Sequence, residues 1–236
     1  MARLPRQVLP GHPHVIIHRA RSGGVAFRDA ADGAFYRALL EATARRTRVA
    51  IHAYALLPVE VRLLVSPETI NGLAELMQSI GRRYVPYFNQ KYGCSGTPWE
   101  GRYRSAVIEV KSYFLACMKY IETSEVQSIH DADSGPVLML PSSAGQHLGL
   151  QTDSVVTDHP AFWALGNTPF ERQAVYKRAL DQSISPPEKT NIAIATLNGW
   201  ALGCDKFLAF VEAQSGRRAH RSEPGRPPKK QGSAPC

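Results

Sequence analysis

The amino-acid sequence predicts an α+β fold in which helices pack on a ferredoxin-like antiparallel sheet. Strand patterns and helical patterns alternate through the first half of the chain in the order β-α-β-β-α-β-α. Hydrophobic residues make up 44% of the 236 residues, which suffices for a core and excludes a wholly disordered chain. A chain of this length forms about one large domain, alone or with appendages, and this order of elements is typical of helices layered on an antiparallel sheet.

Four segments have the composition and alternation of strands. They are residues 14–19, 49–57, 60–65 and 102–110. Along the third segment, apolar residues occupy one face, and Glu60 and Arg62 lie together on the other face because alternate residues of a strand point the same way.

Three segments have helical periodicity, and they are residues 32–47, 70–92 and 112–125. Asp32 is the expected N-cap of the first helix and Ser112 that of the third. The second helix has the clearest pattern, because apolar residues recur at helical spacing from Leu73 to Phe88.

The pattern weakens after residue 126, which divides the chain into three predicted parts. An α+β core, a smaller helical extension and a basic tail are expected over residues 1–130, 131–214 and 215–236. The extension starts with a loop rich in Ser, Gly and Pro, and its helices are expected over residues 170–182 and 190–213. The polar, Pro- and Gly-rich tail is expected to be disordered when free.

The net charge of +8 favours a polyanionic partner, either nucleic acid or an acidic membrane. Basic and aromatic residues alternate between Arg82 and Arg104, which suits single-stranded or unpaired nucleic acid, and a solvated basic helix with a core stripe explains the pattern equally well. The candidates for phosphate contacts are Arg19, Arg82, Arg83, Arg102 and Arg104. For each of them, a solvated surface role is the alternative.

Several classes of protein are disfavoured. No apolar run approaches the length of a spanning helix, and residues 1–10 contain no apolar signal core. The four cysteines lie far apart without a CxxC pair, so neither a zinc site nor a disulfide framework is expected. We therefore expect a cytoplasmic, nucleoid-associated protein with no membrane partner.

Seven short motifs follow one another in a specific order over most of the chain. They are MARLPR at 1–6, PGHPHV at 10–15 with His18 and Arg19 after it, IHAYAL at 51–56, residues 72–89, WEGRYRS at 99–105, residues 113–122 and GRP at 225–227. In this order they resemble the REP-associated tyrosine transposases, a branch of the HUH superfamily of single-strand DNA transposases.

The resemblance implies a particular chemistry. In that family, a strand carries two histidines separated by one hydrophobic residue, and a helix carries a nucleophilic tyrosine followed four residues later by Asn or Gln. Residues i and i+2 of a strand, like residues i and i+4 of a helix, share a face, so three ligands converge on Mg²⁺ or Mn²⁺. The metal polarises the scissile phosphate, and the tyrosine forms a covalent phosphotyrosine.

The resemblance places the catalytic positions at Tyr120, Glu60, Arg62 and Ser124. Tyr120 keeps the nucleophile, whereas Glu60 and Arg62 replace the two histidines and Ser124 replaces the Asn or Gln. Glu60 is a weak candidate ligand for Mg²⁺, but Arg62 stays protonated and repels a cation, and a serine is a weak neutral ligand. We therefore expect no cofactor, impaired metal-dependent cleavage, and a direct pairing of Glu60 with Arg62.

Three functions remain open at this point. The leading one is a degenerate transposase that binds hairpin or single-stranded, REP-like DNA as a monomer. The second is an active strand-cleaving and rejoining enzyme in which Tyr120 works with an altered site, or without metal because Arg62 supplies the positive charge. The third is a remnant that folds and binds DNA only through its charge.

Two further groups of residues have competing explanations. Gly225-Arg226-Pro227 with Lys229 and Lys230 resembles an AT-hook core for a narrow A·T minor groove, and a plain basic tail is the alternative. Three histidines are tempting as ligands, namely His14, His18 and His52. The first two lie about 13 Å apart along one strand, too far for a single ion, so structural or DNA-backbone roles are favoured. Trp99 is expected to pack rather than to stack on a base.

Overall fold

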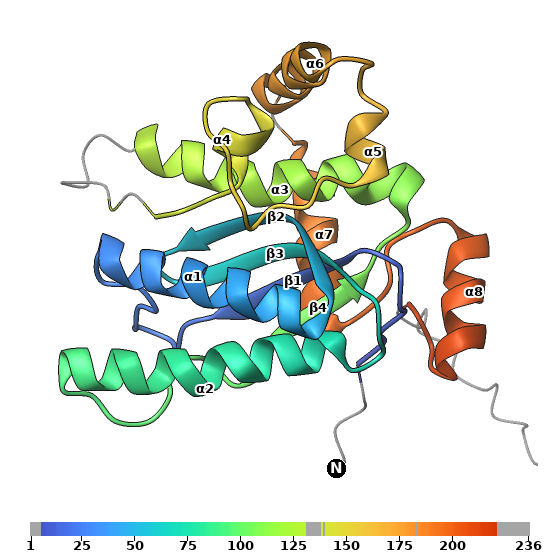
Figure 1. Ribbon diagram of the computed structural model, residues 1–236. Helices are drawn as coiled ribbons and strands as arrows, with labels where there is room; N and C mark the ends of the chain where they lie inside the picture. Colours follow the sequence, from blue (N-terminus) through green and yellow to red (C-terminus); the bar gives the residue numbers. More distant parts are fainter. Residues whose placement is uncertain (1–5, 131–137, 139, 183, 221–236) are drawn as a thin grey trace, which may run out of the picture.

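The computed structural model describes residues 6–130, 138, 140–182 and 184–220 (Figure 1), and for residues 124–130 it describes the backbone alone. The first part of the chain contains four strands and three helices in the predicted order. They are β1 (His14–Arg19), α1 (Ala30–Thr47), β2 (Val49–Leu57), β3 (Glu60–Pro67), α2 (Gly72–Tyr92), β4 (Arg104–Val107) and α3 (Val110–His130). The predicted order β-α-β-β-α-β-α is thus confirmed.

The strands form one antiparallel sheet in the order β2-β3-β1-β4, which is the order of a ferredoxin-like sheet. In the centre of the sheet, Ile17 of β1 lies opposite Arg62 of β3 on one side and opposite Arg104 of β4 on the other. Directly opposed residues of antiparallel strands point to the same face. Arg62, Ile17 and Arg104 therefore form a row across one face of the sheet.

The two faces of the sheet are covered by different helices (Figure 1). Helices α1 and α2 pack on one face, where Tyr36, Tyr84 and Trp99 belong to the main core cluster. Helix α3 packs on the other face, where Ile17 and Phe114 are buried in a second cluster. Apolar side chains on both sheet faces explain why β1 and β3 are so thoroughly buried.

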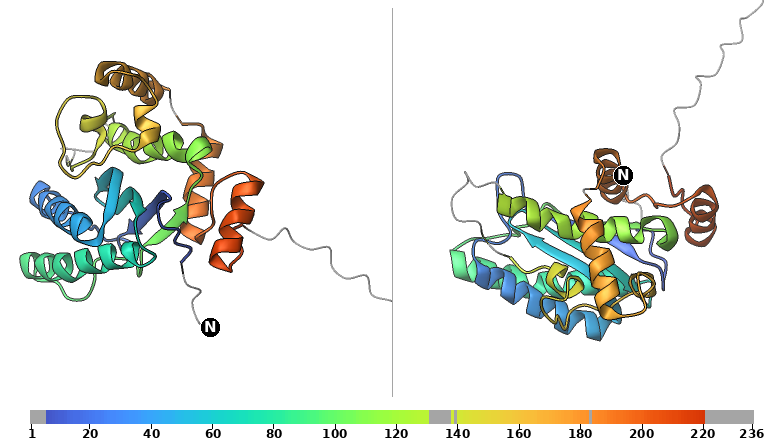
Figure 2. Two further views of the ribbon diagram at one scale, coloured as in Figure 1. Left: turned by 45° about the vertical axis from the view of Figure 1, so that its right-hand side comes forward. Right: turned by 90° about the horizontal axis from the view of Figure 1, so that it is seen from above.

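The C-terminal extension consists of short helices, most of them on the α3 side of the sheet and the last one beside the β4 edge, where Val211 packs with Val107 (Figure 2). They are α4 (Ala144–His147), α5 (Pro160–Trp163), α6 (Pro169–Asp181), α7 (Pro186–Asn198) and α8 (Asp205–Ser215). Phe162, Tyr176 and Ile192 of this extension belong to the same buried cluster as α3. Isolated bridges from Val156 to β2 and from Leu202 to the residue after β4 cover both sheet edges, which blocks pairing with other chains.

Two helix starts differ from the prediction. Asp29 is the N-cap of α1, and Asp32 is the third residue of the helix. The two form a capping box, because each carboxylate accepts a hydrogen bond from the main-chain N–H of the other residue. Ser112 lies inside α3, which starts at Val110, and its hydroxyl donates to Glu109 at 3.0 Å. The strand expected over residues 102–110 is accordingly limited to β4, Arg104–Val107.

The helix expected over residues 190–213 is two helices. Gly199 takes a left-handed φ of 71° after Asn198 and ends α7, a conformation that favours glycine at a helix C-terminus. The chain then pairs with the sheet edge at Leu202 and starts α8 after Cys204. Among the described residues, no helix has the length and apolar character needed to cross a membrane.

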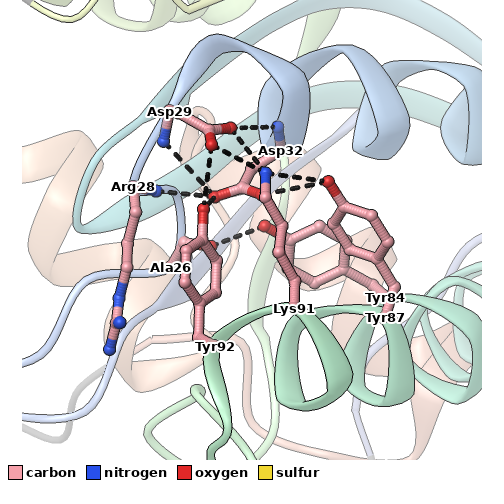
Figure 3. A network of polar contacts seen from close by, with 8 residues as sticks. All are labelled: Ala26, Arg28, Asp29, Asp32, Tyr84, Tyr87, Lys91 and Tyr92. Atoms are coloured by element: carbon pink, nitrogen blue, oxygen red, sulfur yellow. Dashed lines mark hydrogen bonds and ion pairs between the residues drawn. The ribbon is translucent and has the colours of Figure 1, made fainter.

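A polar network joins the start of α1 to the end of α2 (Figure 3). The carboxylate of Asp32 is fully buried and accepts from Lys91 and Tyr92, each at 2.7 Å, and from the main-chain N–H of Arg28 at 2.8 Å. Burial acts to raise the pKa of Asp32, but these donors outweigh it and hold the pKa below its ordinary value. Lys91 also pairs with Asp29, so the network fixes the two helices on their shared face of the sheet.

Candidate functional site

Strand β3 and helix α3 bring together three of the four catalytic positions that the resemblance implies. Glu60 and Arg62 begin β3, and Tyr120 lies in the middle of α3. The Nη1 of Arg62 donates to the main-chain oxygen of Tyr120 at 3.1 Å, and the guanidinium carbon lies 4.5 Å from the centroid of the Tyr120 ring. The fourth position, Ser124, lies one turn further along α3, but its side chain is outside the described residues.

Glu60 is held between two arginines. Its Oε2 accepts from the Nε of Arg19 at 3.1 Å, and its Oε1 accepts from the Nε of Arg62 at 2.5 Å and pairs with a second nitrogen of the same guanidinium. The side chains of Glu60 and Arg62 are only 8% and 13% exposed, whereas that of Arg19 is 44% exposed. The predicted pairing of Glu60 with Arg62 is therefore present, and both carboxylate oxygens are engaged.

The environment of Tyr120 opposes its ionisation. The residue is 3% exposed and packs in the cluster between α3 and the sheet. Burial raises the pKa of its phenol, and the positive charge of Arg62 counteracts burial only in part. A tyrosine attacks phosphorus as its phenolate or with a base beside it, so this environment disfavours a nucleophilic role.

The donors around Tyr120 do not suit a divalent metal. Mg²⁺ and Mn²⁺ need several oxygen ligands, and here the carboxylate of Glu60 already binds two guanidinium groups. Arg19 and Arg62 would also repel the cation. Within the part of the chain that the structure describes, no three His, Cys, Asp or Glu residues gather into a group that could hold a metal ion.

The predicted phosphate-contact residues fall into two groups. Arg102 and Arg104 are exposed at the start of β4, and Arg19 is exposed at the end of the neighbouring strand β1. Arg82 and Arg83 are exposed on α2, which covers the opposite face of the sheet. The remaining candidates, Arg226, Lys229 and Lys230, lie outside the described residues.

The three candidate histidines have structural partners. His14 bonds the main-chain oxygen of His12 at 2.8 Å, and His52 lies in a bulge of β2 between the oxygens of Thr157 and Ser66. His18 stacks on Trp99 with the ring centroids 4.2 Å apart. Trp99 itself is buried, so the prediction that it packs rather than stacks on a base is confirmed.

These histidines predict a pH-dependent stability. Burial lowers the pKa of His14, His18 and His52 to about 4, below the value of about 6.5 in an unfolded chain. Between these two pH values, the unfolded chain binds protons that the folded chain does not. The free energy of unfolding should therefore be highest above pH 6.5, as far as these histidines are concerned, and should fall as the pH drops toward 4.

Urea denaturation between pH 7.5 and 4.5 measures this loss. Each histidine that is neutral in the folded chain should lower the free energy of unfolding by up to about 1.4 kcal/mol for each pH unit of this fall. A His18→Gln variant should show a shallower pH dependence, whereas His220→Gln, at an exposed position, should leave the slope unchanged. Identical slopes in His18→Gln and the unmodified protein would contradict the assignment of a neutral His18.

Of the comparisons with known proteins, the one with solved structures finds similar chains. No protein-family model matches the chain, and no curated protein matches it. A structure of a REP-associated tyrosine transposase bound to a REP hairpin is 17% identical, with a TM-score of 0.46 over 68% of this chain and 96% of that chain. A crystal structure of a proposed transposase from Deinococcus radiodurans R1 is 19% identical, with a TM-score of 0.34 over 50% and 98% of the respective chains. At these values, the function has to be argued from the site.

Two arginines near the site were not among the predicted DNA contacts. Arg6 and Arg217 lie beside Arg102 and Arg104 around one cavity. They are more than 200 positions apart, Arg6 at the end of the first motif and Arg217 in the basic tail. No local signal in the sequence could have joined them.

Proposed function

We propose that this protein is a DNA-binding relative of the REP-associated tyrosine transposases that recognises hairpin or single-stranded DNA and has lost metal-dependent strand cleavage. One observation carries the proposal. Beside Tyr120, where the resemblance implies a nucleophile, the positions that it implies for the metal ligands belong to the Arg19–Glu60–Arg62 ion-pair cluster. The scaffold that presents the tyrosine is thus kept, while the groups that would activate the phosphate are replaced.

Exposed arginines support DNA as the partner. Arg104 lies on the same face of the sheet as Arg62, with Ile17 between them, and Arg102 is exposed two residues before it. Guanidinium groups bind phosphate oxygens in a bidentate manner, which fixes the path of a DNA backbone. The REP-like hairpin is proposed on the resemblance of the motifs, and a monomer is expected on the same ground.

A denaturing gel with a labelled hairpin carrying an unpaired flank tests the loss of cleavage. We expect no covalent protein–DNA band with Mg²⁺ or Mn²⁺, while a native gel at physiological salt shows the hairpin bound more tightly than a random duplex. A band that needs the metal and disappears in Tyr120→Phe would overturn the proposal. Equal binding of hairpin and random duplex would favour a remnant that binds through charge alone.

Metal-independent cleavage is the second candidate, because Arg62 lies directly over the Tyr120 ring. In that reaction, the phenol gives its proton to water and its oxygen bonds to phosphorus, while the bond between phosphorus and the sugar oxygen breaks and that oxygen takes a proton from water. Arg62 would stabilise the negative charge on the phosphate. A covalent band that persists in EDTA and is lost in both Tyr120→Phe and Arg62→Met would establish this reaction. The burial of the Tyr120 phenol argues against it.

A further inference from the structure

A buried histidine of the extension lies against helix α3. The side chain of His147, in α4, is 1% exposed and packs against the rings of Phe162 and Tyr176. Each of its ring nitrogens faces a carboxylate. Nδ1 lies 2.7 Å from Oε1 of Glu122 on α3, and Nε2 lies 3.8 Å from Oδ1 of Asp158, which directly precedes the N-cap of α5. Two carboxylates at opposite ends of one imidazole favour its doubly protonated, cationic form.

In the neutral ring, the contact between His147 and Asp158 would lack a hydrogen. The Oε1 of Glu122 is a carboxylate oxygen that also accepts from the hydroxyl of Ser143 at 2.5 Å, so the hydrogen of a neutral His147 belongs on Nδ1. Nε2 would then be an acceptor that faces another acceptor, Oδ1 of Asp158. Among the described residues, neither of these two buried atoms has a hydrogen-bond partner. A second proton on the ring would turn the opposed acceptors into an ion pair, which removes the cost of leaving them unsatisfied.

The other titratable side chains around this ring keep one protonation state near neutral pH. Burial lowers the pKa of His52 on β2 to about 4, and burial also lowers the pKa of His159, the N-cap of α5. Burial and the charge of Glu122 raise the pKa of Tyr176 on α6 well above its ordinary value. The two histidines are therefore neutral and the tyrosine is protonated. A proton that this cluster binds near neutral pH is left to His147 and its two carboxylates.

His147 lies in the middle of a segment that is attached to the sheet at both ends. Ser142 and Val156 each form an isolated bridge with the edge strand β2, and Asp158 follows the second bridge by two residues. A contact from His147 to both Glu122 and Asp158 therefore holds the whole segment against α3, together with the start of α5 (Figure 1).

We propose that His147 forms a pH-sensitive contact between α3 and the extension. As an imidazolium it joins Glu122 to Asp158, and as a neutral ring it keeps only the bond to Glu122. The closed extension then binds one proton more than the opened extension, so acid favours closure and a rise in pH through the neutral range favours opening. This inference does not depend on DNA binding or on the state of the Tyr120 site.

Nitrogen NMR of the full-length protein, labelled with ¹⁵N in its histidines, tests the protonation directly. At pH 6 we expect hydrogen on both ring nitrogens of His147, and at pH 8.5 on Nδ1 alone. A His147→Gln variant assigns the signals. His52 is the internal control, because its nitrogens lie 2.7 Å from the oxygen of Thr157 and 2.8 Å from that of Ser66, and it should stay neutral at both pH values. A neutral His147 at both pH values would overturn the proposal.

Hydrogen exchange of the α6 amides, corrected for the intrinsic effect of pH, measures the opening. A single linked proton should lower their protection by up to about tenfold per pH unit between pH 6 and 8. Asp158→Asn removes the second carboxylate at nearly constant size and should abolish this dependence, whereas the matched control Asp181→Asn, at an exposed position of α6, should keep it. Protection that does not change with pH, or an equal change in both variants, would overturn the proposal. If Asp158→Asn does not fold, the spectra and the exchange of the unmodified protein still decide.

Discussion

Replacement of Glu60 by alanine is expected to lower the free energy of unfolding by about 3–5 kcal/mol. The substitution leaves the guanidinium of Arg62 13% exposed and in contact with Tyr120, but without its carboxylate. Removing one partner of a buried ion pair is costly because the remaining charge has lost its hydration and its counterion. Urea denaturation at pH 7 measures the change.

Two further variants make this expectation specific. A double variant, Glu60→Leu/Arg62→Met, should regain most of the loss, because apolar side chains of similar size suit a buried position as well as an ion pair does. Glu41→Ala breaks the pair with Arg45, whose side chain is 71% exposed, and should change stability by less than about 1 kcal/mol. A Glu60→Ala variant no less stable than Glu41→Ala would show that Arg62 does not depend on the carboxylate.

The same variants of Glu60 and Arg62 separate the role of the ion pair in stability from a role in DNA binding. If Glu60 and Arg62 serve only to replace a metal centre, the double variant should bind the hairpin as the unmodified protein does. A fall in affinity confined to variants that lack Arg62 would instead assign that guanidinium to the DNA.

Local patterns predicted much of the fold. The alternation in residues 60–65 placed Glu60 and Arg62 on one face, and the structure shows the two side chains paired there. The apolar stripe of α2 and the order of strands and helices are likewise present. These features depend on residues close in sequence, whose side-chain directions follow from the period of the strand or helix. The position of Tyr120 beside them came from the resemblance and not from any pattern.

Features that depend on tertiary pairing were not predictable in this way. Asp29 and Asp32 are both suitable caps, and the choice between them is made by contacts with α2. Gly199 ends α7 where the following segment pairs with the sheet edge at Leu202. The arginine cavity brings Arg6 and Arg217 from opposite ends of the chain to one strand, and only the folded structure joins them.

Replacement of Glu122 by alanine should have an effect of similar size, about 3–5 kcal/mol. The carboxylate of Glu122 is fully buried and accepts from three side chains of the extension. Tyr176 donates its hydroxyl at 2.6 Å, Ser143 its hydroxyl at 2.5 Å, and the Nδ1 of His147 lies 2.7 Å away. Alanine would leave these buried groups without their acceptor, so the extension should detach from α3 more readily.

Hydrogen exchange distinguishes this local opening from global destabilisation. In Glu122→Ala, the amides of α6 and α7 should exchange much faster, while those of α1 and α2 on the other face of the sheet should be affected less. Glu75→Ala, at an exposed position of α2, is the control and should leave the pattern unchanged. Uniformly faster exchange in all helices would show that the extension does not open separately from the core.

The position of Glu122 also links the extension to the candidate site. Residues two apart on a helix point to roughly opposite sides, so α3 is held by Glu122 on the extension side and by Tyr120 and Arg62 on the sheet side. Loosening the first contact should let α3 shift against β3 and weaken the stacking of Arg62 on Tyr120. We therefore expect Glu122→Ala to increase the accessibility of Tyr120 to a phenol-modifying reagent. The control, Glu75→Ala, should leave this accessibility unchanged. Equal modification of Tyr120 in both variants would mean that α3 is fixed by the sheet alone.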